Sequence, residues 1–159
     1  MGFATFSGPL RSGTVRYGAG VNTGLATLTQ SYDTGNLTGT VVGNVDGARF
    51  TLPQGAQIVD IVVDQVVAAT AGTTTISVGT TSGGAELMAA VATTAGGRFR
   101  GTATAATQLA WQTSTSADTT VFVRVAVGTA TLTAGRAIVS IVYVQRNSDG
   151  AQVPSTTQN

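Results

Sequence analysis

The sequence predicts an all-β protein, in the form of an antiparallel β-sandwich or jelly roll with an extended N-terminal arm. Three observations on the 159-residue chain predict this fold. Thr and Val, which favour strands, are among its commonest residues. Its 21 glycines mark many turns, whereas the helix-favouring residues Glu, Lys and Met are scarce. Candidate strands follow one another with turn signals about every 8–12 residues, which is typical of a β-sandwich.

Composition divides the chain into three parts. Residues 1–24 are rich in glycine and still carry several large side chains, which indicates an arm that docks on something. Residues 25–146 hold the candidate strands of the sandwich, and residues 147–159 form a polar tail. The arm either binds a partner or folds back as an edge strand of its own domain. Its candidate partner-binding residues are Phe3, Phe6, Leu10, Arg11, Arg16 and Tyr17.

The first half of the sandwich contains most of the expected strands. We expect them at residues 25–30, 37–45, 49–52, 57–67 and 73–79. A hairpin turn at Asp46-Gly47 is expected to join the second to the third, because Asp-Gly favours two-residue hairpin loops. Residues 57–67 are dominated by β-branched side chains, which indicates a central strand. In residues 73–79, Thr74, Ile76 and Val78 are expected to face the core, since strand side chains alternate between faces.

The second half ends in the strongest strand patterns. We expect one short helical turn at residues 86–91 and one or two strands within residues 98–113. Residues 120–127 place alternating valines on one face, and residues 136–146 are apolar on both faces. These last two segments are expected to form an antiparallel hairpin across residues 128–135. A strand that is apolar on both faces needs cover on both, from two packed sheets or from a subunit interface.

The chain lacks the residues that most catalytic sites use. It contains no Cys, no His and no Lys, so the 8 basic residues are all Arg. This excludes Ser-His-Asp and Cys-His nucleophile systems, Cys/His zinc sites, lysine-dependent phosphate loops and disulfides. Asp60 and Asp64 are the one closely spaced carboxylate pair. On a strand they lie about 13 Å apart, beyond the 5–9.5 Å or so of glycosidases, so a solvated or Arg-paired strand face is expected instead.

The remaining motifs also favour structural interpretations. Residues 18–24 resemble a dinucleotide loop only superficially, because no strand precedes them and no helix follows. Residues 44–47 lack the later acidic ligands of a calcium loop, so a turn is preferred. Arg98 and Arg100 form the closest basic pair, which indicates a solvated strand face. Trp111 is the sole Trp and is expected to anchor the core or an interface rather than stack on a sugar. We therefore expect no enzyme, no cofactor and no metal site.

Charge and hydropathy indicate what the protein binds. A net charge of +1 gives no basic field for nucleic acid, and no apolar run reaches the 18 or so residues of a membrane helix. Only 9% of the residues are charged, so the exposed positions must be mostly Thr, Ser, Gly, Ala and Gln. Uncharged surfaces and flat strand edges tend to associate. We therefore expect persistent assembly, most simply as a symmetric homo-oligomer.

Several segments resemble small accessory virion proteins of tailed bacteriophages. These are residues 6–16 (FSGPLRSGTVR), 22–24 (NTG), 26–30 (ATLTQ), 51–59 (TLPQGAQIV), 76–79 (ISVG) and 133–144 (TAGRAIVSIVYV). The resemblance implies a capsid decoration (cement) protein, a trimeric β-sandwich on the outer capsid surface that braces neighbouring major capsid subunits. It implies no catalytic residues. The alternatives are a head-fibre or tail structural component and, in another class, a secreted carbohydrate-binding or surface-fibre module.

Overall fold

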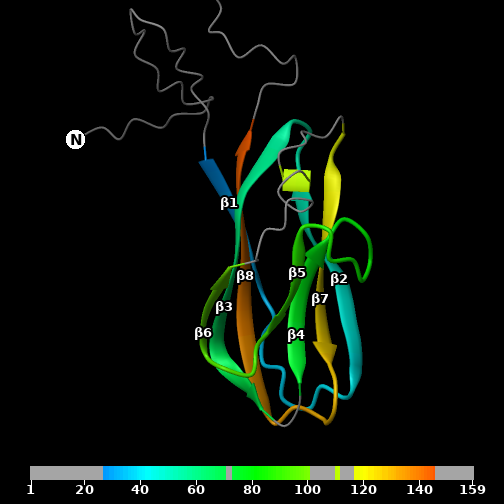
Figure 1. Ribbon diagram of the computed structural model, residues 1–159. Coiled ribbons are helices and arrows are strands. Elements are labelled where there is room, and N and C mark those ends of the chain that lie inside the picture. Colours follow the sequence, from blue (N-terminus) through cyan, green and yellow to red (C-terminus); the bar gives the residue numbers. More distant parts are fainter. Residues whose placement is uncertain (1–26, 71–72, 101–109, 112–116, 146–159) are drawn as a thin grey trace, which may run out of the picture.

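Eight strands form two four-stranded antiparallel sheets that pack face to face (Figure 1). The computed structural model describes residues 27–70, 73–100, 110–111 and 117–145. The strands are β1 (Thr27–Asp33), β2 (Gly43–Leu52), β3 (Ala56–Thr70), β4 (Thr74–Gly79), β5 (Met88–Ala92), β6 (Gly97–Arg100), β7 (Thr119–Val127) and β8 (Ala134–Gln145). The strand order is β1-β8-β3-β6 in one sheet and β2-β7-β4-β5 in the other. This arrangement confirms the predicted all-β sandwich.

The pairing pattern is that of a jelly roll. β1 pairs with β8, β2 with β7, β3 with β6 and β4 with β5, so the chain resembles one long hairpin rolled into two sheets. β8 and β3 lie inside one sheet, and β7 and β4 inside the other. The four remaining strands are the sheet edges.

Alternating apolar side chains build the core between the sheets. β7 buries Val121, Val123, Val125 and Val127, as the sequence pattern predicts. The facing side chains of β8 are Ala137, Val139, Ile141 and Tyr143, all buried. β4 buries Thr74, Ile76 and Val78, also as predicted. The long strand expected at residues 57–67 is β3, and its Ile61 and Val63 are fully buried.

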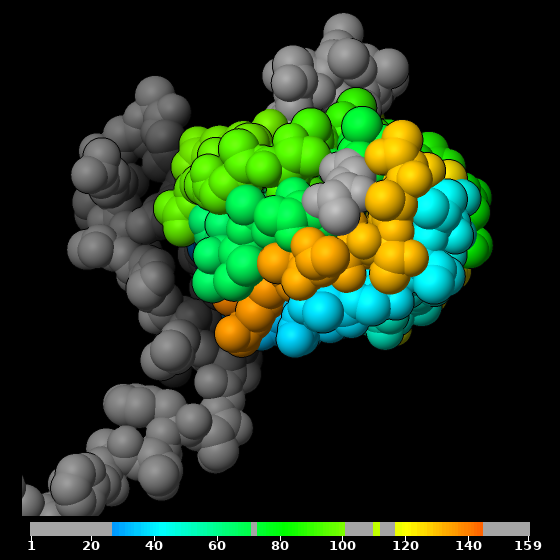
Figure 2. Space-filling model, turned by 90° about the horizontal axis from the view of Figure 1, so that it is seen from below, coloured from blue at the N-terminus to red at the C-terminus, as the bar shows by residue number. Residues whose placement is uncertain are grey.

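The expected hairpin between residues 120–127 and 136–146 is wrong. β7 and β8 lie in opposite sheets, and the chain crosses between them at residues 128–133 (Figure 2). Leu132 in this connection is buried, and its backbone N–H and C=O bond to Thr40 and Gly39. Burial of Leu132 at the end of the core holds the connection across the gap between the sheets, where a hairpin turn would leave this side chain in water.

The expected turn at Asp46-Gly47 is also wrong. Both residues lie within β2, opposite Arg124 and Val123 of β7. The chain turns instead between β1 and β2, where Gly35 and Gly39 adopt φ angles of +69° and +86°. The pairing of β2 with β7 over its whole length outweighs the local preference of Asp-Gly for a hairpin loop.

Residues 86–91 form no helical turn. Met88–Ala92 is strand β5, and the N–H of Leu87 donates to the carbonyl of Val78 in the neighbouring strand. Leu87 and Met88 are buried, so their apolar pattern reflects their position at the core. Of the region 98–113, β6 provides one strand, while residues 101–109 and 112–116 lie outside the described residues.

The two ends of the described chain lie at the same end of the sandwich. Thr27, the first residue of β1, pairs with Val144 near the end of β8 (upper end in Figure 1). The connections at the opposite end include residues 34–42 and 128–133, which lie side by side in Figure 2. Segments that extend from either terminus therefore start from one common end.

Candidate interaction surfaces

The carboxylate pair noted in the sequence is bound to arginines. Arg98 Nε and Nη2 donate to the two oxygens of Asp64 at 2.6 and 3.1 Å, and Arg100 Nε lies 3.4 Å from Asp60 Oδ2. These contacts join β3 to the edge strand β6 on the outer face of their sheet. The solvated or Arg-paired strand face expected for Asp60 and Asp64 is therefore confirmed, and Arg98 and Arg100 lie on an exposed strand face, as expected.

Two further ion pairs join edge strands to inner strands. Arg124 of β7 donates to both oxygens of Asp46 in β2 at 2.8 and 3.2 Å. Arg136 of β8 binds Asp33 of β1 in the same way. Exposed pairs of this kind contribute little to the free energy of folding, but their bidentate geometry favours one register of the edge strands.

The other two described carboxylates have local roles. Asp118 accepts the backbone N–H of Gln54 at 2.9 Å. Glu86 accepts the backbone N–H of Thr80 and the hydroxyl of Thr81. Each acidic side chain in the described part of the chain therefore contacts a neighbour in its own fold, and no cluster of three potential metal ligands occurs there. These residues also include no helix long and apolar enough to cross a membrane.

Hydrogen bonds lower the pKa of four carboxyl groups. The pKa values of Asp33, Asp46 and Asp64 lie below the usual 3.8, and that of Glu86 lies below 4.5. The principal donors are Arg136 for Asp33, Arg124 for Asp46, Arg98 for Asp64 and Thr81 for Glu86. A lowered pKa means that the folded protein gains stability above the usual pKa and loses it as the pH falls through the lowered one.

We expect the melting temperature to be nearly constant from pH 5 to 9 and to fall below about pH 4. The chain has no His, and the four lowered pKa values all lie below this window. Melting followed by circular dichroism from pH 2 to 9 measures this. A change of more than about 8 °C between pH 5 and 9 contradicts the expectation.

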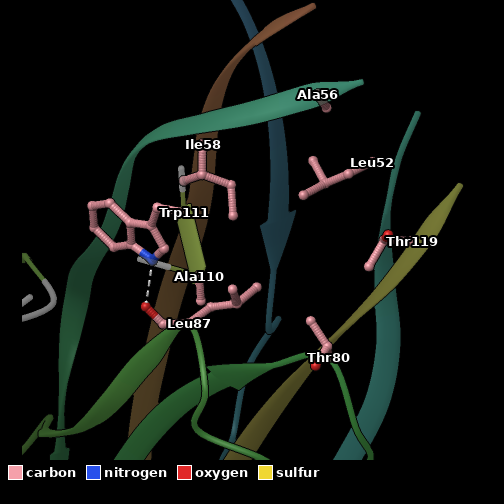
Figure 3. Close-up of a pocket in the computed structure, with 8 residues that line it drawn as sticks. All are labelled: Leu52, Ala56, Ile58, Thr80, Leu87, Ala110, Trp111 and Thr119. Atoms are coloured by element: carbon pink, nitrogen blue, oxygen red, sulfur yellow. Dashed lines mark hydrogen bonds between the residues drawn. The ribbon is translucent and has the colours of Figure 1, made fainter. Parts of the chain in front are cut away.

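Trp111 closes the end of the sandwich from which both termini extend. Its indole N–H donates to the carbonyl of Leu87 at 2.7 Å, and its ring packs on the core (Figure 3). Beside it lies a cavity of about 40 Å³, lined by Leu52, Ala56, Ile58, Thr80, Leu87, Ala110, Trp111 and Thr119. Ligand sites usually measure about 300–1,000 Å³, so this one is too small for a sugar or a cofactor. The expected anchoring role of Trp111 in the core is confirmed.

The start of β2 carries a group of exposed valines that the sequence interpretation did not identify. Val41, Val42 and Val45 expose 67%, 53% and 44% of their surface. They lie just before and within β2, an edge strand. The sequence interpretation missed them because it placed residues 37–45 in a paired strand of a hairpin, where such valines would be covered.

The outer face of the other sheet is partly apolar. Ile138, Val142 and Val144 of β8 point away from the core and are half-buried, and Val62 of β3 lies beside them. The expectation that β8 is apolar on both faces is therefore correct, and the sandwich covers one of them. The six candidate arm residues Phe3, Phe6, Leu10, Arg11, Arg16 and Tyr17 lie outside the described residues.

Comparisons with known proteins give matches among solved structures. Neither the protein-family models nor the curated proteins include a match. A chain in the capsid of Ralstonia phage GP4 is similar, with 28% identity and a TM-score of 0.57 over 87% of this chain and 93% of that one. A chain in the capsid asymmetric unit of cyanophage Pam1 has the same fold, with 22% identity and a TM-score of 0.53 over 90% of this chain and 99% of that one. Both similarities extend over nearly the whole of each chain.

Proposed function

We propose that this chain is a structural protein of a phage capsid. The observation that carries the proposal is the 28% identity with the Ralstonia phage GP4 capsid chain, together with a common fold over nearly the full length of both. A match over 87% of this chain is longer than a recurring fragment of β-structure. The cyanophage Pam1 chain supports the fold.

Within the capsid, we propose the role of a decoration protein on the outer surface that braces neighbouring major capsid subunits. The segments that resemble accessory virion proteins support this role, and they include parts of β1, β3, β4 and β8. Four ion pairs join neighbouring strands of the fold, which suits a structural role. We accordingly propose neither an enzymatic activity nor a cofactor.

Oligomerisation is the first prediction of this proposal. We expect a homotrimer in solution, because a sandwich with little surface charge leaves exposed valines and an apolar outer face that need cover. Light scattering at micromolar concentration should give about three times the chain mass of 15.9 kDa. A particle of a single chain mass contradicts this prediction.

Co-sedimentation with capsids tests the proposed role. Purified protein is mixed with tail-free capsids that lack it, and the bound amount is measured as its concentration increases. The proposal predicts saturation at a fixed number of copies per capsid. Binding to isolated tails alone identifies a tail component, and binding to glycans alone identifies a carbohydrate-binding module. Either of these outcomes overturns the decoration role.

A further inference from the structure

β2 is the longest strand at a sheet edge. It contains 10 residues, whereas the edge strands β1, β5 and β6 contain 7, 5 and 4. An unpaired edge presents backbone N–H and C=O groups that can bind another extended chain. Edges are commonly protected by Lys, Pro or a bulge, and β2 contains neither Lys nor Pro.

The upper part of β2 is protected by contacts with β1. The Gln30 side-chain amide bonds to both the N–H and the C=O of Thr51, at 3.4 and 2.8 Å. The Arg49 guanidinium lies 4.5 Å from the centre of the Tyr32 ring, and a bulge interrupts β2 between Ala48 and Phe50. The Arg49 guanidinium also lies against Gly47, but within the described part of the chain no hydrogen bond reaches the outer side of the backbone of residues 43–48.

The register of β2 on β7 shows which backbone N–H and C=O groups of residues 43–48 point away from β7. The N–H of Gly128 donates to the carbonyl of Thr73, so the backbone of Val127 is directed away from β4 and toward β2. Because the two sides of a strand alternate along the chain, the backbone N–H and C=O of Val45 point toward Val125, its partner in β7. The backbone N–H and C=O of Asn44 and of Asp46 therefore point to the open side of β2. The side chain of Val45, 44% exposed, lies on the inner face of this open edge.

We propose that residues 43–48 bind residues 13–18 of the N-terminal arm of a second copy of this chain, as an added antiparallel strand. This inference rests on the self-association proposed above and names the surfaces that perform it. The arm supplies a strand-forming run, Thr-Val-Arg-Tyr, between Gly13 and Gly18.

The side chains of the two segments are complementary. With Val15 opposite Val45, the two valines cover each other on the inner face. Tyr17 then lies opposite Gly43, where a Cβ atom would meet nothing within 4 Å, so an aromatic ring fits over the glycine. Arg16 falls on the outer face, near the carboxylate of Asp46.

The length of the arm indicates that the strand added to β2 comes from a second copy rather than from the same chain. β1 begins at the end of the sandwich where β2 finishes, since Gln30 contacts Thr51. For an antiparallel arm of the same chain, residues 18–26 would have to return from Gly43 to that end. The ten Cα–Cα steps from Tyr17 to Thr27 extend at most about 36 Å. The eight steps from Gly43 to Thr51 span about 27 Å, and Thr27 lies three residues, or about 10 Å, beyond Gln30. No length remains for a turn, whereas an arm from a neighbouring copy has no such limit.

Disulfide trapping tests the inference, because the full-length chain contains no Cys of its own. A tagged Val15→Cys variant and an untagged Val45→Cys variant are mixed and oxidised without capsids. Opposite residues at this position have Cα atoms about 4.5 Å apart, which suits a disulfide. We expect a covalent heterodimer of one tagged and one untagged chain. The matched control is Asn44→Cys, mixed with the same tagged Val15→Cys variant. Asn44 is also exposed, but its side chain lies on the opposite face of β2, so this pair should form at least tenfold less covalent heterodimer.

The outcomes separate this inference from the proposed function. Heterodimer formation no greater than in the Asn44→Cys control overturns the inference. If the double variant Val15→Cys/Val45→Cys forms only an intramolecular disulfide, the arm folds onto its own chain, and the second-copy inference is again wrong. Val45→Lys provides an independent check, since it should leave the melting curve unchanged and weaken self-association at least tenfold. Unchanged self-association contradicts the inference even if capsid binding is intact.

Discussion

Deletion of residues 1–17 should leave the sandwich folded and abolish its binding to capsids. All eight described strands and the core between them lie within residues 27–145, so the truncated chain keeps the contacts that stabilise the fold. The deleted arm contains four large apolar side chains and two arginines, the residue types that dominate interface energies. Loss of two anchors at about 2 kcal/mol each weakens binding on the order of 1,000-fold.

Two measurements check this prediction on the same samples. Circular dichroism melting should be cooperative and nearly unchanged, and co-sedimentation with capsids should be lost. Deletion of residues 147–159 is the matched control, because it removes a tail from the same end of the sandwich and should leave binding intact. If the arm deletion unfolds the protein, the arm is a strand of its own domain. If the truncated protein binds as tightly as the full chain, the capsid contact lies on the sandwich.

Leu132→Ala should destabilise the protein by about 2–5 kcal/mol, the usual cost of truncating a buried leucine. Leu132 is only 1% exposed and closes the lower end of the core. Its backbone bonds to Gly39 and Thr40 bring together the two connections at that end, so the cavity cannot collapse freely. For a domain of this size, the melting temperature should fall on the order of 10 °C.

Leu28→Ala is the control for this substitution. It removes the same atoms from a strand residue that is 42% exposed, so the cost should stay below about 1 kcal/mol. Urea unfolding of both variants measures the difference. Similar small costs for the two substitutions would show that Leu132 does not close the core as described.

The sequence predicts the strands better than it predicts their pairing. Alternation of apolar and polar residues is a local property, and it identifies β4, the centre of β3 and β7 correctly. Pairing depends on contacts distant in sequence. The hairpin expected between β7 and β8 fails because one leucine in the connection is buried between the sheets. The turn expected at Asp46-Gly47 fails because β2 pairs with β7 over its whole length, which places Asp46 opposite Arg124, 78 residues away.

Some residues of the candidate surfaces are likewise predictable from the sequence, and others are not. The sequence anticipates that Asp60 and Asp64 lie on one strand face that is solvated or Arg-paired, because their spacing excludes a catalytic pair, but it does not identify Arg98 and Arg100 as their partners. The exposed Val41, Val42 and Val45 are not anticipated. Valine in a strand normally indicates burial, but Val41 and Val42 precede β2, and Val45 lies in β2 at a sheet edge.

Electron cryomicroscopy of particles from a phage that lacks this chain tests the central claim most directly. The decoration role predicts closed, DNA-filled capsids that have lost a jelly-roll-sized density from the outer surface, and these capsids should break at lower temperature than wild-type capsids. Addition of the purified protein should restore both the density and the stability. The absence of any capsid, or complete capsids with density missing only from the tail, would contradict the account.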